Sequence, residues 1–265
     1  MALDMDGTIY RGGTLLPCTN PFLDLLRQLD ISYSFLTNNS SKSVAEYAAR
    51  LRKMGVPAEP TQIFISTQAT MEYLKTEQPK VRRLFLLGSS GMAGELQAAG
   101  YTLTEDSALD EPDAVLVGFD LDLDFSRLCR AAYWIKQGKL FVASHPDRVC
   151  PTDQPTVIVD CGAICAALQS ATGRAPDAVP GKPDPRMLLG LCRRLAFAPE
   201  ELAMVGDRIY TDIEMARQAG VLGVLVLSGE ATAADAAANE WPLDLIVRDL
   251  EEFGQHLCKA REKTP

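Results

Sequence analysis

Hydrophobic and polar residues follow two different rhythms along the chain. Short apolar runs, such as LFLLG at 84–88 and LGVLVL at 222–227, are typical of strands that are buried on both faces. The segments between such runs place apolar residues three or four positions apart, as in Phe22, Leu25 and Leu29, which is the spacing of a helix. The alternation of the two patterns predicts an α/β protein with a largely parallel sheet.

Polar residues, prolines and glycines mark where several helices begin and end. Asn20 before Pro21 predicts a helix with Asn20 as its cap and Pro21 in its first position. A second helix is predicted from about Ser43, with Gly55 past its end, and Asp184 opens a later one. The periodicity alone does not divide the chain into domains.

Length and composition restrict the class of protein. With 265 residues, the chain is long for one compact domain and comfortable for two. Its net charge of −9 and the lack of a basic stripe argue against a nucleic-acid partner. No apolar run approaches the roughly 20 residues of a membrane span, and no stretch resembles a signal peptide. We therefore expect no membrane partner and a cytoplasmic location.

The cysteines and histidines indicate no special chemistry. Seven cysteines are scattered along the chain without a Cys-x-x-Cys pair, and there are only two histidines. The odd number and the spacing indicate reduced, mostly buried thiols rather than a disulfide framework. The same counts argue against a zinc site.

Five short polar stretches stand out against the apolar pattern, and most of them follow a predicted strand. They are DMDGT at 4–8, TNN at 37–39, GKP at 181–183, GDR at 206–208 and TD at 211–212. In an open parallel sheet the carboxyl ends of the strands lie along one edge, and ligands bind in the crevice there. Each stretch alone is typical of an ordinary turn or loop. Their convergence at one site is what the pattern predicts.

The charges in these stretches favour a magnesium and phosphate site. Asp4, Asp6, Asp207 and Asp212 would repel one another at one edge unless a cation lay among them, and oxygen ligands without cysteine or histidine favour Mg²⁺. Lys182, together with a threonine hydroxyl and backbone N–H groups at 37–39, can hold a phosphate.

The Asp-x-Asp spacing suits phosphoryl transfer. Residues two apart in a straight strand point the same way, and a turn at Met5 would let one carboxylate face phosphorus while the other reaches the leaving oxygen. Gly7 would allow a tight backbone behind them. A carboxylate nucleophile paired with a general acid divides the hydrolysis of a phosphate ester into two easier steps through an aspartyl-phosphate.

Four longer segments carry a resemblance to a known family. They read DMDGTIY at 4–10, FLTNNSSKS at 35–43, GKPDP at 181–185 and VGDRIYTDI at 205–213. In this order they resemble the motifs of haloacid-dehalogenase (HAD) superfamily phosphatases, within them the NagD-like, 4-nitrophenylphosphatase-like branch. The resemblance covers essentially the whole chain.

The resemblance implies a fold and a domain organisation. A Rossmann-like parallel-sheet HAD core would be formed by residues 1–70 and 179–265, and an inserted α/β cap domain by residues 71–178. The insertion accounts for the long gap between the phosphate-binding stretches. Caps in this branch often carry an interface, so the resemblance also implies a possible homo-oligomer through the cap.

The resemblance assigns catalytic and phosphate-binding roles to five residues. Asp4 would be the nucleophile that becomes phosphorylated, and Asp6 would protonate the leaving group and later activate water. Thr37 and Asn38 would bind the transferring phosphoryl group, and Lys182 would neutralise it.

The resemblance also implies a metal site and a substrate loop. Mg²⁺ would be held by the side chains of Asp4 and Asp207 and by the backbone carbonyl of Asp6, with support from Asp212. SHPD at 144–147 resembles a cap loop that commonly reads Thr-Asn-x-Asp and contacts substrate. His145 and Asp147 are therefore candidate specificity residues, with a solvent-facing loop histidine as the alternative.

Two departures from the family pattern carry expectations of their own. Asp120, Asp122 and Asp124 look like a metal loop but lack the glycine and glutamate of an EF-hand, so we expect exposed cap surface. Only residues 1–3 precede Asp4, where relatives carry several apolar residues. We expect either a very short first strand or residues missing from this version of the sequence.

The function that these observations predict is Mg²⁺-dependent hydrolysis of phosphomonoesters through an aspartyl-phosphate. The substrates would be small phosphorylated metabolites, such as a sugar phosphate or a nucleoside monophosphate, with p-nitrophenyl phosphate as an artificial substrate. Two other classes stay open: a phospho-aspartate acceptor module with a regulatory role, and a catalytically retired binding protein.

Overall fold

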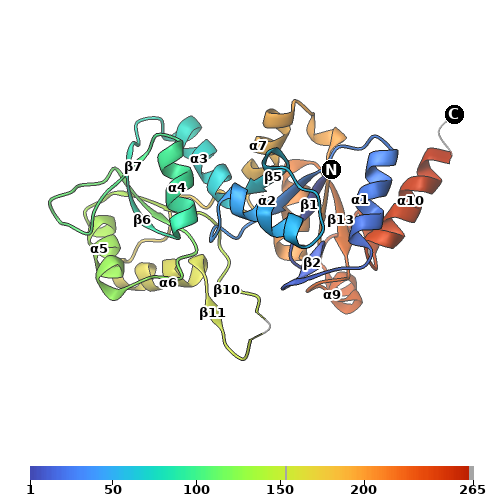
Figure 1. Cartoon of the computed structure of the whole chain (residues 1–265). Helices are drawn as coiled ribbons and strands as arrows, with labels where there is room; N and C mark the ends of the chain where they lie inside the picture. The colour runs from blue at the N-terminus through green and yellow to red at the C-terminus, as the bar shows by residue number, and fades with distance from the viewer. Residues whose placement is uncertain (153, 263–265) are drawn as a thin grey trace. The chain divides into compact units, whose positions relative to one another are not determined.

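The computed structural model describes residues 1–152 and 154–262 (Figure 1). The chain divides into two compact units. The first unit contains residues Met1–Thr37, Ala48–Phe64 and Leu188–Pro265, and the second contains Asn38–Tyr47 and Ile65–Met187. The predicted domain boundaries at 70/71 and 178/179 stay a prediction, and each unit is described by itself below.

A six-stranded sheet forms the centre of the first unit. Its strand order is β14 (Leu245–Val247), β13 (Leu222–Val226), β12 (Ala203–Gly206), β1 (Ala2–Asp4), β4 (Ser34–Thr37), β5 (Ile63–Ile65). The pairs from β14 through β4 are parallel, as predicted. The expected short first strand is confirmed, because β1 has only three residues, with Ala2 and Leu3 fully buried.

Helices and turns surround this sheet. They are α1 (Thr19–Gln28), η1 (Pro60–Gln62), η2 (Pro199–Glu201), η3 (Ile209–Ile213), α8 (Glu214–Ala219), α9 (Ala233–Ala238) and α10 (Leu250–Glu262), with a short hairpin of β2 (Tyr10–Arg11) and β3 (Thr14–Leu15). Two further helices, α2 (Val44–Lys53) and α7 (Arg186–Leu195), have residues in both units.

The start of α1 differs from the prediction. The helix begins at Thr19 and its cap is Cys18, not Asn20. The reason is a buried tertiary contact, since the Thr19 hydroxyl donates to the Ile9 carbonyl at 2.6 Å and fixes the first turn. The Asn20 amide is used elsewhere, donating to the carbonyl of Gly55 at 3.3 Å.

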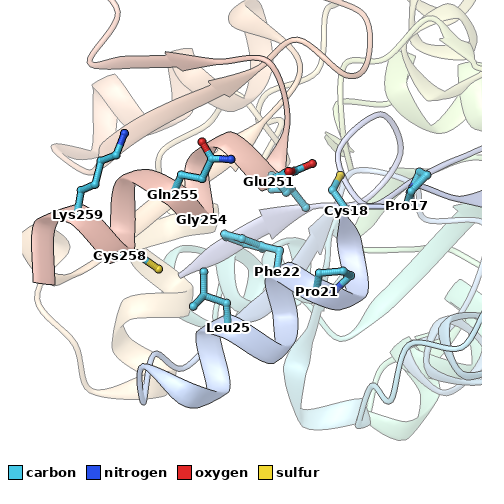
Figure 2. Close-up of a pocket in the computed structure, with 11 residues that line it drawn as sticks. Pro17, Cys18, Pro21, Phe22, Leu25, Glu251, Gly254, Gln255, Cys258 and Lys259 are labelled. Atoms are coloured by element: carbon cyan, nitrogen blue, oxygen red, sulfur yellow. The ribbon is translucent and has the colours of Figure 1, made fainter. Parts of the chain in front are cut away.

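Helices α1 and α10 lie side by side and border a cavity of about 690 Å³ (Figures 1 and 2). Phe22 stacks against Phe253 with ring centroids 5.6 Å apart. Gly254 permits the close approach, because a Cβ there would lie 2.9 Å from Leu25 Cδ2. Among the residues that line the cavity there is no predicted site residue in the described part of the chain.

The second unit has a sheet of its own. Its four strands run in the order β7 (Thr102–Leu103), β6 (Arg83–Leu87), β8 (Ala114–Val117), β9 (Leu140–Ala143), and all three pairings are parallel. Helices α3 (Ser66–Glu77) and α4 (Ser90–Ala98) supply one apolar core, and α5 (Phe125–Lys136) and α6 (Cys161–Thr172) supply the other. A hairpin of β10 (Val149–Cys150) and β11 (Ile158–Val159) precedes α6. The predicted parallel α/β fold is confirmed.

The acidic stretch at 120–124 is only partly the exposed surface that we expected. Asp122 and Asp124 are exposed, and Asp124 caps α5 by accepting from the Arg127 backbone N–H at 2.8 Å. Asp120 is buried, with 6% of its surface exposed, and its carboxylate pairs with the Arg127 guanidinium at 2.8 Å. The prediction was wrong for Asp120 because the later arginine supplies a counter-charge.

All seven cysteines are free thiols, as predicted, but only three of them are buried. The expectation of mostly buried thiols was therefore wrong. In residues 1–152 and 154–262, no helix has the length and apolar character that crossing a membrane would need.

Candidate functional site

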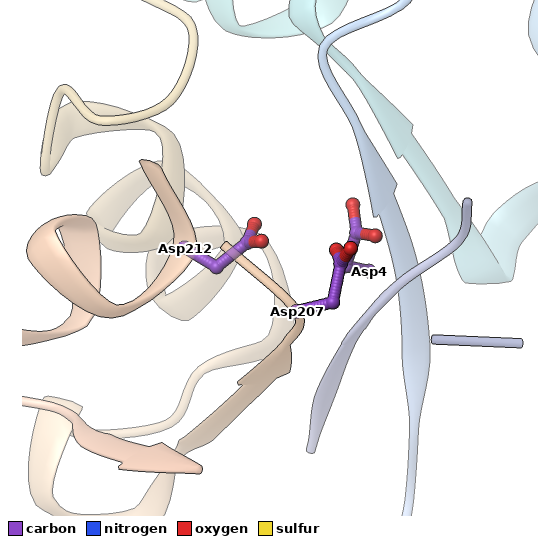
Figure 3. Close-up of side chains that lie close together, drawn as sticks. All are labelled: Asp4, Asp207 and Asp212. Atoms are coloured by element: carbon purple, nitrogen blue, oxygen red, sulfur yellow. The ribbon is translucent and has the colours of Figure 1, made fainter. Parts of the chain in front are cut away.

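Three carboxylates meet at one edge of the six-stranded sheet (Figure 3). Asp4 ends β1, Asp207 directly follows β12, and Asp212 lies in η3. One carboxylate oxygen of each lies within 4.8 Å of the other two. The sheet brings the first two together, because β1 and β12 are parallel neighbours with Leu3 opposite Val205. We call Asp4, Asp207 and Asp212 the carboxylate cluster.

Backbone from two distant loops holds the Asp207 carboxylate. The Glu230 N–H donates to Asp207 Oδ2 at 2.7 Å. Glycines allow the loops to come this close, since a Cβ would lie 1.9 Å from Asp207 Oδ2 at Gly229 and 2.2 Å from it at Gly7, where φ is +91°. The Ser228 hydroxyl joins the two loops by donating to the Gly7 carbonyl at 2.7 Å.

Gly229 and Glu230 contribute to the site but were not predicted from the sequence. A signal was available, because GE at 229–230 follows the apolar run LGVLVL, and a parallel sheet brings the loop after that strand to the same edge.

A π-helical turn supplies Asp212. The turn, η3, accommodates Asp212 against Gly206, where an added Cβ would lie 2.4 Å from the Asp212 Cβ. The Arg208 N–H donates to Asp212 Oδ2 at 3.2 Å, and Asp212 is 1% exposed. Single π turns occur frequently at functional sites, because the extra residue redirects a side chain.

The negative charge of the cluster acts on Arg208, which directly follows Asp207. Burial alone lowers the pKa of Arg208, but the charges of Glu230, Asp207 and Asp4 outweigh burial and raise it. Its guanidinium pairs directly with Glu230, with Nε 2.9 Å from the carboxylate.

The carboxylate cluster fits a hard divalent cation. All three donors are carboxylate oxygens, Asp207 and Asp212 are almost fully buried, and their spacing lets one ion contact one oxygen of each. Oxygen donors of this type are those that Mg²⁺ prefers. A bound cation would also offset the repulsion among three like charges in a poorly solvated place.

The side chain of Asp6 stands apart from the cluster. The chain turns sharply behind β1, with the Gly7 N–H donating to the Tyr10 carbonyl at 2.7 Å and the Ile9 N–H to the Met5 carbonyl at 2.9 Å. Asp6 is half-buried, and burial raises the pKa of its carboxyl despite the nearby Gly12 N–H. A raised pKa lets this carboxyl keep a proton to higher pH, which suits a general acid.

Thr37 ends β4 at the same edge of the sheet. Its neighbour Leu36 pairs with Asp4 across the parallel β1–β4 ladder, so Thr37 lies one residue beyond the partner of Asp4. Only 9% of Thr37 is exposed. The structure therefore brings Thr37 to the edge where Asp4 ends.

Asn38 and Lys182 meet within the second unit. The Lys182 N–H donates to Asn38 Oδ1 at 2.8 Å, and Asn38 Nδ2 donates to the Lys182 carbonyl at 3.0 Å. Gly181 fits tightly beside them, since a Cβ there would lie 2.4 Å from the Ser144 carbonyl oxygen and 2.9 Å from Asn38 Oδ1. The side chain of Asn38 thus fixes the backbone of Lys182.

His145 is fully buried, so the solvent-facing alternative is wrong. Its ring nitrogens lie near two carboxylates, with Nδ1 3.4 Å from Asp147 Oδ2 and Nε2 3.5 Å from Asp160 Oδ1. Asp147 keeps 13% of its side chain exposed, and Asn38 Nδ2 donates to its Oδ1 at 3.4 Å. A role of His145 or Asp147 in specificity stays a prediction.

Comparison with known families agrees with the motifs. A model described as haloacid dehalogenase-like hydrolase matches residues 1–102, and a HAD-hydrolase-like model matches residues 179–253. The first match contains Asp4, Asp6, Thr37 and Asn38. The second contains Lys182 together with residues 207 and 212.

Individual relatives are similar over nearly the whole chain. The structure of a 4-nitrophenylphosphatase from Thermotoga maritima is 36% identical, covers 96% of this chain and 95% of that chain, and has a TM-score of 0.89. A glycerol phosphate phosphatase from Mycobacterium tuberculosis, solved in complex with magnesium, is 32% identical over 94% of this chain and 74% of that chain, with a TM-score of 0.86. An acid sugar phosphatase of Staphylococcus aureus is 29% identical over 250 residues, 94% of each chain. The predicted likeness to the 4-nitrophenylphosphatase-like branch is confirmed.

Proposed function

Because the chain belongs to the haloacid dehalogenase-like hydrolase family, we propose that it is a Mg²⁺-dependent phosphatase of small phosphomonoesters. Relatives named for 4-nitrophenyl phosphate, sugar phosphate and glycerol phosphate hydrolysis support this substrate class. The relative solved with magnesium supports the choice of metal.

The observation that carries the proposal is the carboxylate cluster. Its oxygens converge within 4.8 Å on the sheet edge where ligands bind in open parallel sheets. Bound there, Mg²⁺ would neutralise charge on a phosphate and orient it towards Asp4. Asp4, Asp207 and the backbone carbonyl of Asp6 would hold the ion, with Asp212 in support.

Asp4 and Asp6 divide the reaction between them. An oxygen of Asp4 attacks phosphorus, and the bond from phosphorus to the leaving oxygen breaks while Asp6 gives that oxygen its proton. Water then attacks the phosphorus of the aspartyl-phosphate and loses a proton to Asp6. Inorganic phosphate leaves, and both carboxyl groups return to their starting states. The raised pKa of Asp6 is the property that the first step requires.

The phosphate-binding roles of Thr37, Asn38 and Lys182 belong to the same proposal. The Thr37 hydroxyl and the backbone after it would donate to phosphate oxygens, and the ammonium of Lys182 would neutralise charge. A cytoplasmic location and a homo-oligomer formed through the cap are further predictions.

The test is phosphate release from p-nitrophenyl phosphate with and without Mg²⁺. We expect turnover only with the metal, and we expect Asp4→Asn to abolish it. Asp122→Asn is the matched control, because it makes the same chemical change at an exposed position. Wild-type protein that is inert with Mg²⁺ across a broad panel of phosphate esters would refute the proposal. A phosphorylated Asp4 that lasts for minutes would favour an acceptor module instead.

A further inference from the structure

We propose that His145 is a positioning residue: as an imidazolium held between Asp147 and Asp160, it fixes Asp147, and through Asp147 and Asn38 it fixes the backbone of Lys182. We call His145, Asp147, Asp160 and Asn38 the imidazolium clamp. The effect on catalysis rests on the proposed function, whereas the clamp itself does not.

Three loops of the second unit come together at the clamp. The loop after β9 carries His145, the segment at 38–40 follows β4, and the loop at 181–182 precedes α7. Gly181 is where they pack most closely, because a Cβ there would lie 2.9 Å from His145 Cβ as well as close to Asn38. Ser40 adds a contact, with its Oγ 3.5 Å from His145 Nε2. If the histidine moved, the loops at 38–40 and 181–182 would therefore have to shift as well.

The first link of the clamp is the ring itself. Its two nitrogens lie 3.4 Å and 3.5 Å from carboxylate oxygens of Asp147 and Asp160. Both nitrogens are donors only in the imidazolium, since a neutral ring keeps one lone pair. A neutral His145 would direct that lone pair at Asp147 or, if it lay on Nε2, at Asp160 and the Ser40 hydroxyl, which is 3.5 Å away. In this fully buried place a carboxylate near each nitrogen favours the charged ring.

The second link runs from Asp147 to Lys182. One oxygen of Asp147 faces the imidazole and the other accepts from Asn38 Nδ2. The same amide nitrogen donates to the Lys182 carbonyl, and Asn38 Oδ1 accepts from the Lys182 N–H. Both N–H groups and the oxygen of this amide are thus engaged within the protein. Asn38 acts on phosphate through its position next to Thr37 and through Lys182, not through a free side-chain donor.

The third link anchors the clamp to helix α6. Asp160 caps this helix, accepting from the Cys161 N–H at 2.6 Å, and it therefore cannot move away from the ring without cost. The Gly162 N–H donates to the Asp147 carbonyl at 2.7 Å, and a Cβ on Gly162 would lie 2.0 Å from the Pro146 carbonyl oxygen. The loop that carries His145 is consequently held against the N-terminus of α6.

The charged and titratable groups facing the ring are Asp147, Asp160 and Cys161. Burial alone lowers the pKa of His145, but the Cys161 sulfur and the two carboxylates outweigh burial and raise it to about 9. When the ring loses its proton, Asp147 and Asp160 lose their attraction to the imidazolium. Asp147, the more exposed of them, then turns towards water and releases Asn38. The Lys182 backbone loses a restraint.

The first experiment measures the clamp without any enzyme assay. Only two histidines exist, so His256→Gln on the exposed face of α10 leaves a single imidazole, whose NMR resonances need no further assignment. We expect His145 to titrate well above 6.5, and the Asn38 side-chain amide to shift with the same midpoint. In Asp147→Asn we expect the imidazole midpoint to fall and the Asn38 shift to disappear. An imidazole midpoint at or below pH 6.5 in the variant that keeps His145, or an Asn38 amide whose chemical shift does not change during the titration, would overturn the proposal.

The second experiment measures the consequence for phosphate release. We expect kcat/KM for p-nitrophenyl phosphate to fall about tenfold above the His145 midpoint, since small displacements of a charged group are costly. Asp147→Asn should move this alkaline limb to lower pH, and Cys161→Ser, which keeps a donor for the Val117 carbonyl, should also move it to lower pH because the thiolate charge no longer raises the pKa of His145. An alkaline limb that does not move in Asp147→Asn would refute the catalytic role. Wild-type protein that releases no phosphate would refute the proposed function alone, because the NMR titration still decides the clamp.

Discussion

The carboxylate cluster and the imidazolium clamp handle buried negative charge in opposite ways. The cluster gathers three carboxylates at a sheet edge and holds them with backbone donors and glycines. The clamp gathers two carboxylates around a protein cation, the ring of His145. In the first arrangement three carboxylate oxygens converge, as the ligands of a divalent cation would, whereas in the second a protein side chain lies between the two acids. Closely spaced acids in a sequence can therefore belong to either kind of site, and the fold decides which.

The sharpest way to break this comparison is to remove one acid of the cluster. Asp207→Asn should lower kcat/KM by at least about a hundredfold and weaken Mg²⁺ activation, because a charged ligand becomes a neutral one. A Mg²⁺ titration of activity measures both effects. Asp120→Asn is an informative companion, since Asp120 is also buried but lies outside the cluster and pairs with Arg127. Equal losses of Mg²⁺ activation in the two variants would contradict the distinction.

The clamp makes a prediction about stability and pH. The folded-state pKa of His145 is raised from 6.5 to about 9, so its stabilisation is complete below pH 6.5 and is lost as pH rises through about 9. The loss amounts to about 3 kcal/mol at roughly 1.4 kcal/mol per pKa unit. Urea denaturation at several pH values measures it, and the decline should be absent in His145→Asn.

Cys161 must be separated from this effect. Burial raises the pKa of the thiol, but its hydrogen bond with Cys165 and the positive charge of His145 outweigh burial and lower it to about 7. A lowered pKa adds stability as pH rises, which opposes the histidine. Cys161→Ser removes this gain and also removes the thiolate charge that helps to raise the pKa of His145, so the decline should end at a lower pH in this variant. A decline that ends at the same pH as in the wild type would contradict the role given to the thiolate.

The glycines around Asp207 offer a smaller but cleaner test. Gly229→Ala should destabilise the protein by about 1–3 kcal/mol, because the new Cβ would lie 1.9 Å from the carboxylate. Gly13→Ala is the matched control, since no heavy atom lies within 4 Å of a Cβ there. Thermal denaturation of both variants checks the prediction. Equal melting temperatures for the two variants would show that the loop at 229 can move away from Asp207 at little cost in stability.

The smallest expected effect is on the melting temperature itself. Mg²⁺ should raise it by a few degrees at concentrations well above its Kd, because an ion that binds only the folded protein stabilises it. Asp207→Asn should reduce the rise, and His145→Asn should leave it unchanged. A rise that persists in Asp207→Asn would place the bound ion elsewhere.

Sequence patterns predicted the parts of the molecule that depend on local order. Asp4 ends an apolar strand and Asp207 directly follows one, so the topology of a parallel sheet was enough to predict that they meet. The three residues before Asp4 predicted a short first strand. To predict these features, it is enough to know whether each element is a strand or a helix and at which edge of the sheet it ends.

Other features depend on contacts between distant residues and could not be predicted. Nothing in a Ser-His-Pro-Asp loop indicates that Asp160 will face the second nitrogen of the ring, since the partner lies on another element. The start of α1 was misplaced because a hydroxyl bond from Thr19 to Ile9 overrides a good local cap. Gly229 and Glu230 were missed because their roles depend on the distant Asp207: the Glu230 N–H donates to its carboxylate, and Gly229 leaves room for it.

The central position of β1 constrains when the active site can exist during synthesis. Ala2 and Leu3 pair with Met204 and Val205, about two hundred residues later along the chain. The second unit, mostly the continuous stretch Ile65–Met187, can fold while the chain is still emerging from the ribosome. Asp4 is made about two hundred residues before Asp207 and Asp212, and its cluster is assembled only once both have followed. A nascent chain therefore carries Asp4 through the synthesis of the whole second unit before the carboxylates that it joins exist.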